Sequence, residues 1–204
     1  MHQTFTLDVP DRAMRFAVHD WGGDGPLALL AHANSFCAAL WTPVAARLRA
    51  RYHVVGYDLR GHGHSSVPPW PQSYQWQEFS ADAIAVAERL CARDHVTHVA
   101  LSVGHSFSGT CAAVAAAQRP DLYARVVMID PILIPHPQWH PDVPRDQMGA
   151  RLAAGTRRRQ AVFSSRAAAR AALLSHPKLF YRNWQPQCLD LFGAWGLRDR
   201  PAGQ

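Results

Sequence analysis

The chain has 204 residues, 48% of them hydrophobic, and a formal net charge of +6 at pH 7. This composition suits a globular domain with a hydrophobic core. No apolar run reaches the roughly 18 residues that a membrane-spanning helix needs, and residues 1–8 lack the basic and apolar regions of a secretory signal peptide. We therefore expect neither a membrane span nor a secretory leader.

Most of the positive charge lies in one segment. Residues 145–170 hold seven arginines and one acid, Asp146, so the rest of the chain is close to neutral. Because no broad basic surface results, we expect no nucleic-acid partner. The basic segment is either a solvated helix face or a surface that attracts acidic substrates or an anionic partner.

The four cysteines are scattered and form no Cys-x-x-Cys pair. This distribution favours reduced thiols in a cytoplasmic protein over a disulfide framework or a zinc site. His62 and His64 could be considered as a metal pair, but their spacing supplies no third ligand. We therefore predict no metal site and no cofactor.

The N-terminal residues predict three strands. Residues 3–9 alternate polar and apolar side chains, as a half-buried strand does, and residues 14–19 repeat the pattern after a turn at Pro10. The stretch 21–26 contains three glycines and a proline and predicts a break. Residues 27–31 are all apolar, which is typical of a strand buried on both faces of a parallel sheet.

Helices and buried strands alternate after residue 31. The patterns predict helices over 40–50, 78–92 and 110–118, and strands over 52–57, 99–103 and 125–130. This alternation indicates an α/β fold with a mostly parallel sheet, flanking helices and right-handed crossovers. Ligands of such sheets bind beyond the carboxyl ends of the strands. Four polar residues stand at those ends: His32, Asp58, Ser106 and Asp130.

The sequence changes in character near residue 133. Prolines cluster first, helical and arginine-rich stretches follow, and no further buried-strand pattern occurs. We therefore predict two parts, a core over residues 1–132 and a helical cap or lid over residues 133–204.

The most informative stretch is Gly104-His-Ser-Phe-Ser-Gly109, between the predicted strand 99–103 and the predicted helix 110–118. A serine at a sharp strand-to-helix turn needs small residues two positions before and after it. Gly104 meets this need, whereas Ser108 stands where glycine is usual. The helix that follows directs its unpaired N–H groups and its positive dipole end toward the serine.

This motif resembles the nucleophile elbow of the α/β-hydrolase superfamily. His32–Phe36 resembles the family's oxyanion loop, with alanine in the glycine position, and Asp58–Ser65 resembles the loop after the next strand. Val127–Pro131 is similar to the strand after the elbow helix, and residues 196–203 look like the end of a cap in the esterase/lipase-like branch. The matching motifs span nearly the whole chain in the family's order.

The resemblance implies a serine hydrolase that acts on an ester, thioester or similar acyl bond of a small molecule through an acyl-enzyme. Ser106 would be the nucleophile, and the backbone N–H groups of Asn34 and Phe107 would form the oxyanion hole. A serine at this position disfavours epoxide opening and dehalogenation, which use a carboxylate nucleophile in this superfamily.

For the other polar residues near the predicted site, we expect structural rather than catalytic roles. We expect Asp58, Arg60, His62 and His64 to shape a loop through local hydrogen bonds, and His32 to be a structural histidine of its loop.

The triad acid and histidine of this superfamily follow the serine and usually lie after two further strands, beyond the cap. The sequence ends at Gln204, about where the cap ends, so we expect a chain truncated before those strands and impaired in activity. Asp130 with a cap histidine offers a relocated triad, and a non-catalytic binding or interaction protein is a further alternative. The candidate histidines are His136, His140 and His176.

If the chain is truncated before those two strands, the predicted strand 125–130 lies at the edge of the sheet. An apolar strand edge that is exposed can pair with another chain. Self-association through this edge is therefore part of the prediction.

Overall fold

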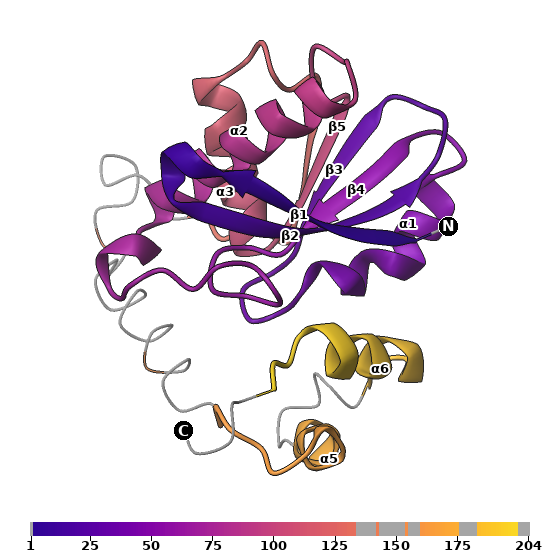
Figure 1. Ribbon diagram of the computed structural model, residues 1–204, viewed down its shortest axis with the longest axis vertical. Coiled ribbons are helices and arrows are strands. Elements are labelled where there is room, and N and C mark those ends of the chain that lie inside the picture. The colour runs from indigo at the N-terminus through magenta and orange to yellow at the C-terminus, as the bar shows by residue number, and fades with distance from the viewer. Residues whose placement is uncertain (1, 134–141, 143–153, 155–159, 176–182, 200–204) are drawn as a thin grey trace. The chain divides into compact units, whose positions relative to one another are not determined.

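The structure is a computed structural model, and it describes residues 2–133, 142, 154, 160–175 and 183–199 (Figure 1). The chain forms two compact units, residues 1–132 together with 185–204, and residues 133–184. The strands and helices are β1 (Gln3–Val9), β2 (Met14–Gly22), β3 (Leu27–Ala31), α1 (Thr42–Leu48), β4 (His53–Tyr57), α2 (Trp76–Arg93), β5 (Leu101–His105), α3 (Phe107–Gln118), β6 (Val126–Ile129), α5 (Arg166–Ser175) and α6 (Pro186–Trp195), with short 3-10 helices at Pro10–Arg12, Ala38–Trp41 and Gln72–Tyr74.

Six strands form one sheet in the order β1-β2-β4-β3-β5-β6. The strands β4, β3, β5 and β6 run parallel, whereas β1 pairs antiparallel with β2, and β2 pairs antiparallel with β4. The α/β fold with a mostly parallel sheet and flanking helices is therefore confirmed. The ends of the predicted strands agree to within two residues, except that β2 ends three residues later than expected.

Both faces of the central strands are covered, which explains their continuous apolar sequences. On one face, Leu29 packs in a cluster that includes Phe79 of α2 and Phe107 of α3. On the other face, Leu30 packs in a cluster that includes Ala45 of α1. Figure 1 accordingly shows α2 and α3 on one side of the sheet and α1 on the other.

The end of β2 differs from the sequence-based expectation. The stretch 21–26 predicts a break, but β2 continues through Gly22, with an irregular register between Asp20 and Gly22. Trp21 is only 3% exposed, and its indole N–H donates to Thr42 Oγ1 at 3.1 Å. Burial of this large ring, together with the bulge, extends the strand beyond the point where the local sequence favours a turn.

The two edges of the sheet differ in exposure. β6 forms one edge and, among the described strands, pairs with β5 alone. Its residues Val127, Met128 and Ile129 are 44%, 43% and 43% exposed. At the other edge, β1 alternates exposed polar residues with less exposed apolar ones. The exposed apolar edge expected at residues 125–130 is thus present.

Residues from Gln185 onward belong to the core unit, whereas the sequence predicts a cap over the whole of 133–204. The reason lies in the contacts of α6 and the segment after it. The Trp195 ring packs edge-on against His19, with centroids 4.9 Å apart, and the Arg198 guanidinium donates to the Gly63 carbonyl oxygen. The role of residues 133–184 as a cap stays a prediction.

The second unit contains α5, whose start is capped by Ser165. The Oγ atom of Ser165 accepts a hydrogen bond from the Ala168 N–H at 3.0 Å, which satisfies one donor of the first helical turn. Within the described ranges, no helix is both long enough and apolar enough to cross a bilayer.

Candidate active site

Ser106 lies in the turn between β5 and α3 and has a strained backbone. Its φ is +56° and its ψ is −124°, a combination that non-glycine residues rarely adopt. The Ser106 N–H donates to the Ile129 carbonyl of β6 at 2.8 Å and so holds the turn against the sheet. A Cβ at Gly104 would stand 2.4 Å from the Ser108 carbonyl oxygen, so a side chain there would force the turn apart. The predicted need for a small residue two positions before Ser106 thus has a steric cause.

Ser108 fits the position where glycine is usual and adds a contact that glycine cannot make. Its side chain is buried, and its Oγ donates to the His32 carbonyl oxygen at 2.5 Å. This hydrogen bond joins the first turn of α3 to the residue that follows β3. The departure from the glycine pattern therefore fastens the elbow to the neighbouring loop.

The two predicted oxyanion donors, the backbone N–H groups of Phe107 and Asn34, lack a backbone acceptor within the described chain. Phe107 is the first residue of α3, where N–H groups have no partner in the helix. Asn34 lies in the exposed turn after β3, and no described backbone carbonyl accepts its N–H. The Phe107 ring packs edge-on against Phe79 and Trp76, at 4.7 and 4.9 Å between centroids, which fixes the start of the helix.

His32 is a structural histidine of this loop, as expected. It is 2% exposed, its Nδ1 contacts the Ala33 carbonyl oxygen at 2.8 Å, and its Nε2 accepts the Leu59 N–H at 3.0 Å. These partners require a neutral ring that carries its proton on Nδ1. Burial lowers the pKa of His32 well below its usual value, with the nearby His62 acting in the same direction. The ring therefore joins the loops after β3 and β4 without a charge.

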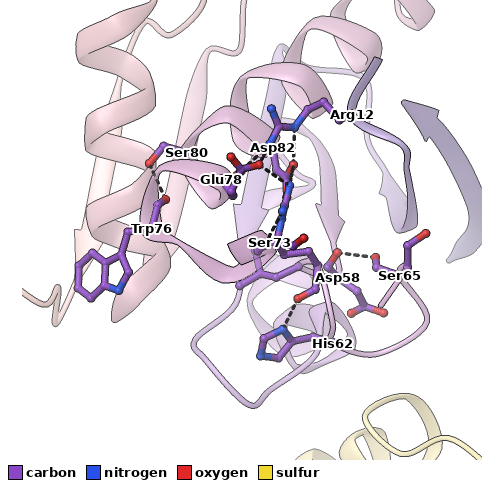
Figure 2. Close-up of polar contacts among 12 residues, drawn as sticks. Arg12, Asp58, His62, Ser65, Ser73, Trp76, Glu78, Ser80 and Asp82 are labelled. Carbon is purple, nitrogen blue, oxygen red and sulfur yellow. Dashed lines mark hydrogen bonds and ion pairs between the residues drawn. The ribbon is translucent and has the colours of Figure 1, made fainter. Parts of the chain in front are cut away.

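The loop after β4 is organised by Asp58, which is fully buried. Its carboxylate accepts the Ala38 N–H at 2.7 Å and the His64 N–H at 2.9 Å. A Cβ at Gly63 would lie 1.9 Å from the Asp58 carboxylate, so glycine is required there. The Ser65 hydroxyl donates to the Asp58 carbonyl oxygen at 2.5 Å, a bond drawn in Figure 2. The expected loop-shaping roles of these residues are confirmed.

A buried ion-pair network joins the loop after β4 to helix α2. Asp82 of α2 accepts two hydrogen bonds from the Arg60 guanidinium, both at 2.6 Å. It accepts a third from Arg12 at 2.6 Å, and Figure 2 shows Arg12 beside Asp82 and Glu78. Arg12 also pairs with Glu78 at 2.7 Å, and Arg60 donates to the Ser73 carbonyl oxygen at 2.6 Å. Since Arg60 and Asp82 are 3% and 1% exposed, each depends on the other for compensation of its charge.

The role of Asp82 was not predicted from the sequence. The available signal was an acid on the apolar face of an amphipathic helix, three residues after Phe79 and four before Val86. Both of those neighbours are buried in the core. A carboxylate in such a position has to find a cation, because isolated buried charges are strongly destabilising.

Asp130, the candidate relocated acid, directly follows the residue whose carbonyl holds Ser106. Its φ is +46°, and its side chain is exposed. No hydrogen bond or ion pair joins it to another residue of the described chain. The histidines that would accompany it lie outside the described residues, so the structure places no triad partner for it. These are His136, His140 and His176.

The histidine pair after β4 does not have the arrangement of a metal site. His62 uses both ring nitrogens in contacts within the protein, with the Arg60 carbonyl oxygen and the Ser35 N–H, at 2.9 Å each. His64 packs against the Trp195 ring, at 5.9 Å between centroids. Over the described ranges, no group of three or more His, Cys, Asp or Glu residues is arranged to hold a metal ion.

Several known proteins are similar to this chain. A 2-(acetamidomethylene)succinate hydrolase of Mesorhizobium japonicum is 39% identical over 108 residues, which cover 53% of this chain and 36% of the relative. The crystal structure of E-2-(acetamidomethylene)succinate hydrolase matches 96% of this chain and 64% of its own length, with a TM-score of 0.73 and 26% identity. A thioesterase domain from the curacin biosynthetic pathway has the same fold, with a TM-score of 0.70 at 22% identity.

The chain spans about a third of the curated relative in sequence and somewhat less than two thirds of the solved hydrolase. The family model for the α/β-hydrolase fold matches residues 26–187, which contain Ser106, the loops after β3 and β4, and β6. This match extends over most of the chain and agrees with the parallel sheet and with the strained serine turn. The chain therefore belongs to the α/β-hydrolase family.

Proposed function

We propose that this chain carries the nucleophile and the oxyanion hole of a serine hydrolase that cleaves an ester, thioester or similar acyl bond. The observation that carries the proposal is the strained turn of Ser106, at the start of α3 and joined to the loop of Asn34 through Ser108. Such a turn holds a hydroxyl clear of the sheet, in the position for attack on a carbonyl carbon.

In the proposed reaction, the Ser106 Oγ attacks the substrate carbonyl carbon while a base takes the hydroxyl proton. The carbonyl oxygen becomes an oxyanion, which accepts hydrogen bonds from the N–H groups of Asn34 and Phe107. Loss of one such donor typically slows the reaction about 10²–10³-fold. As the intermediate collapses, the base returns the proton to the leaving group, which departs as an alcohol or thiol. Water then hydrolyses the acyl-enzyme, which releases the acid and restores the Ser106 hydroxyl. Small-molecule acyl compounds are the proposed substrates.

The proposed reaction needs a base that takes the proton of the Ser106 hydroxyl. No histidine of the described chain is hydrogen-bonded to Ser106. Since serine is a weak nucleophile without an adjacent base, the proposed activity is low unless a histidine is supplied. Asp130 together with His136, His140 or His176 is one source, and residues beyond this sequence are another.

A cytoplasmic location is also proposed. Cys37, Cys91 and Cys111 are buried and unpaired, and Cys188 is unpaired as well. Burial raises the pKa of Cys37 and of Cys111 to about 12, which keeps both thiols protonated. Free thiols support a reducing compartment.

Labelling with a fluorophosphonate tests the proposal. We expect the probe to modify Ser106, as located by peptide mass spectrometry, and Ser106→Ala to abolish the signal. Ser164→Ala, a change at an exposed serine of the second unit, serves as the control. Loss of labelling in Asp130→Asn would favour the relocated triad. A folded chain that is never labelled would contradict catalysis by this chain alone.

A second candidate function is favoured by β6, whose exposed apolar residues are suited to pairing with another protein chain. In this case the fold serves binding rather than turnover. Association that persists in Ser106→Ala, in a protein that no fluorophosphonate labels, would support the binding function over the hydrolase.

A further inference from the structure

The turn that carries Asn34 has an unusual conformation for its sequence. The Phe36 N–H donates to the Ala33 carbonyl oxygen at 3.1 Å, which closes a four-residue β-turn. Ser35, the third residue, has a φ of +68°, whereas Asn34 is not among the residues with positive φ. This is a type II turn, in which the third position normally favours glycine. A serine there is strained, so another interaction must select this turn over the type I alternative.

His62 provides that interaction. Its Nε2 accepts the Ser35 N–H at 2.9 Å. Type I and type II turns differ by a flip of their central peptide, here the one between Asn34 and Ser35. Such a flip would turn the Ser35 N–H away from His62 and break the hydrogen bond. The acceptor on His62 therefore favours the observed turn directly.

The His62 ring is itself held in place. Its Nδ1 contacts the Arg60 carbonyl oxygen at 2.9 Å, so Nδ1 bears the proton and Nε2 the lone pair. The flanking Gly61 and Gly63 have φ values of +73° and +46°, which permit the tight loop. Arg198 donates to the His62 carbonyl oxygen at 3.1 Å. The ring is thus oriented before any substrate binds.

Charged and titratable groups surround the ring on several sides. Burial lowers the pKa of His62, opposed by the contact with the Arg60 carbonyl and by Asp58, and Arg198 lowers it further. His32 lies edge-on at 5.2 Å between ring centroids. The Asn34 Oδ1 stands 3.0 Å from His62 Nε2. A protonated ring would donate to this oxygen and lose the Ser35 N–H, whereas the neutral ring accepts from Ser35.

We propose that His62 is the positioning residue of the oxyanion loop: its Nε2 holds the Ser35 N–H and thereby fixes the conformation of the turn that contains Asn34, the proposed oxyanion donor. This role rests on the proposed hydrolase function. His62 does not touch the reacting atoms and acts through the turn alone.

The first test is independent of catalysis. NMR measures the hydrogen-exchange rate of the Ser35 amide in the whole chain and in the variants His62→Leu, His62→Gln and His64→Leu. We expect exchange about 5-fold faster in His62→Leu, because one hydrogen bond is lost. The glutamine Oε1 can replace the Nε2 acceptor, so His62→Gln stays close to the unmodified chain, as does the control His64→Leu. Unchanged exchange in His62→Leu, or a ring protonated on Nε2 in the nitrogen spectrum, would overturn the proposal.

The second test measures the rate at which a fluorophosphonate labels Ser106. We expect about a 10- to 100-fold slower reaction in His62→Leu, since misplaced catalytic groups lose rate steeply, and substantial rescue in His62→Gln. Faster Ser35 exchange with an unchanged labelling rate would overturn the positioning role and leave a purely structural one. If the unmodified chain is not labelled, the proposed function fails for this chain, and the exchange rates alone decide whether His62 controls the turn.

Discussion

The two sides of Ser106 differ in how firmly they are built. On the side of β3 and β4, buried groups such as Ser108, His32 and Asp58 are joined by hydrogen bonds of 2.5–3.0 Å. On the side of β6, Asp130 is exposed and has no hydrogen-bond partner within the described ranges. The contrast teaches that buried hydrogen bonds hold the loop of the proposed oxyanion donor Asn34 against the elbow, whereas no described residue is hydrogen-bonded to Ser106 as a base would be.

The largest effect on stability is expected from the buried ion pair between Arg60 and Asp82. Asp82→Ala leaves Arg60, which is 3% exposed, without its bidentate partner. Breaking a buried pair in this way costs about 3–5 kcal/mol of unfolding free energy. Urea denaturation measures the loss. Asp11→Ala removes an exposed partner of Arg89 and should have no measurable effect. Equal stability of the two variants would contradict the structural role of the network.

Low pH should lower the free energy of unfolding, because the core contains buried histidines. Burial lowers the pKa of His19 from 6.5 to about 4, so between these pH values the unfolded chain binds more protons than the folded one. Stability is full above pH 6.5 and falls by up to about 3 kcal/mol as the pH drops through this window. The lowered pKa values of His32 and His62 act in the same direction. Urea denaturation at several pH values measures the slope, which His19→Leu should reduce. An identical slope in that variant would refute the assignment to His19.

The turn between the two sides offers a matched pair of glycine changes. At Gly104 a Cβ would lie 2.4 Å from the Ser108 carbonyl oxygen, whereas no atom of the described residues lies within 4 Å of a Cβ added at Gly193 of α6. We expect Gly104→Ala to destabilise the chain by about 1–3 kcal/mol and Gly193→Ala to be neutral or stabilising by up to about 1 kcal/mol. Denaturation curves compare the two. A neutral Gly104→Ala would show that the elbow tolerates a side chain.

The smallest change in stability is expected at the exposed edge strand β6. Val127→Lys places a charge on the exposed strand β6 and should alter the unfolding free energy by less than about 0.5 kcal/mol. It should nevertheless reduce self-association, because charged residues block pairing at strand edges. Val114→Lys is the control, since Val114 is similarly exposed, at 40% against 44%, but lies on α3. Light scattering measures the association, and an equal effect of both changes would argue against edge pairing.

The sequence was sufficient for the sheet because burial on two faces leaves a local trace. β3 is a continuous apolar run, and β4 is buried from Val54 to Tyr57; the sequence indicates both strands within one residue of their observed ends. Helix α3 starts at Phe107 rather than at Thr110, since the elbow residues themselves form its first turn. Glycine and serine are weak helix formers, so here tertiary contacts override local preference.

The candidate site was predictable only in part, because its supporting contacts join distant segments. The motif around Ser106 identifies the turn, but nothing local shows that Ser108 bonds the His32 carbonyl, 76 residues away in sequence. The partnership of Asp82 with Arg60, and that of His62 with Ser35, likewise depend on how the loops meet. The oxyanion and nucleophile roles stay predictions until they are tested.

The Ser108 hydroxyl has a mechanical consequence. It limits the distance between the helix that begins at Phe107 and the loop that carries Asn34, because the buried Ser108 hydroxyl donates directly to the His32 carbonyl oxygen. Fluctuations of the two segments should therefore be correlated, so that the space between their N–H groups keeps its width as the surrounding chain moves. A single side chain would then act as a spacer whose length sets the size of the group that fits between them.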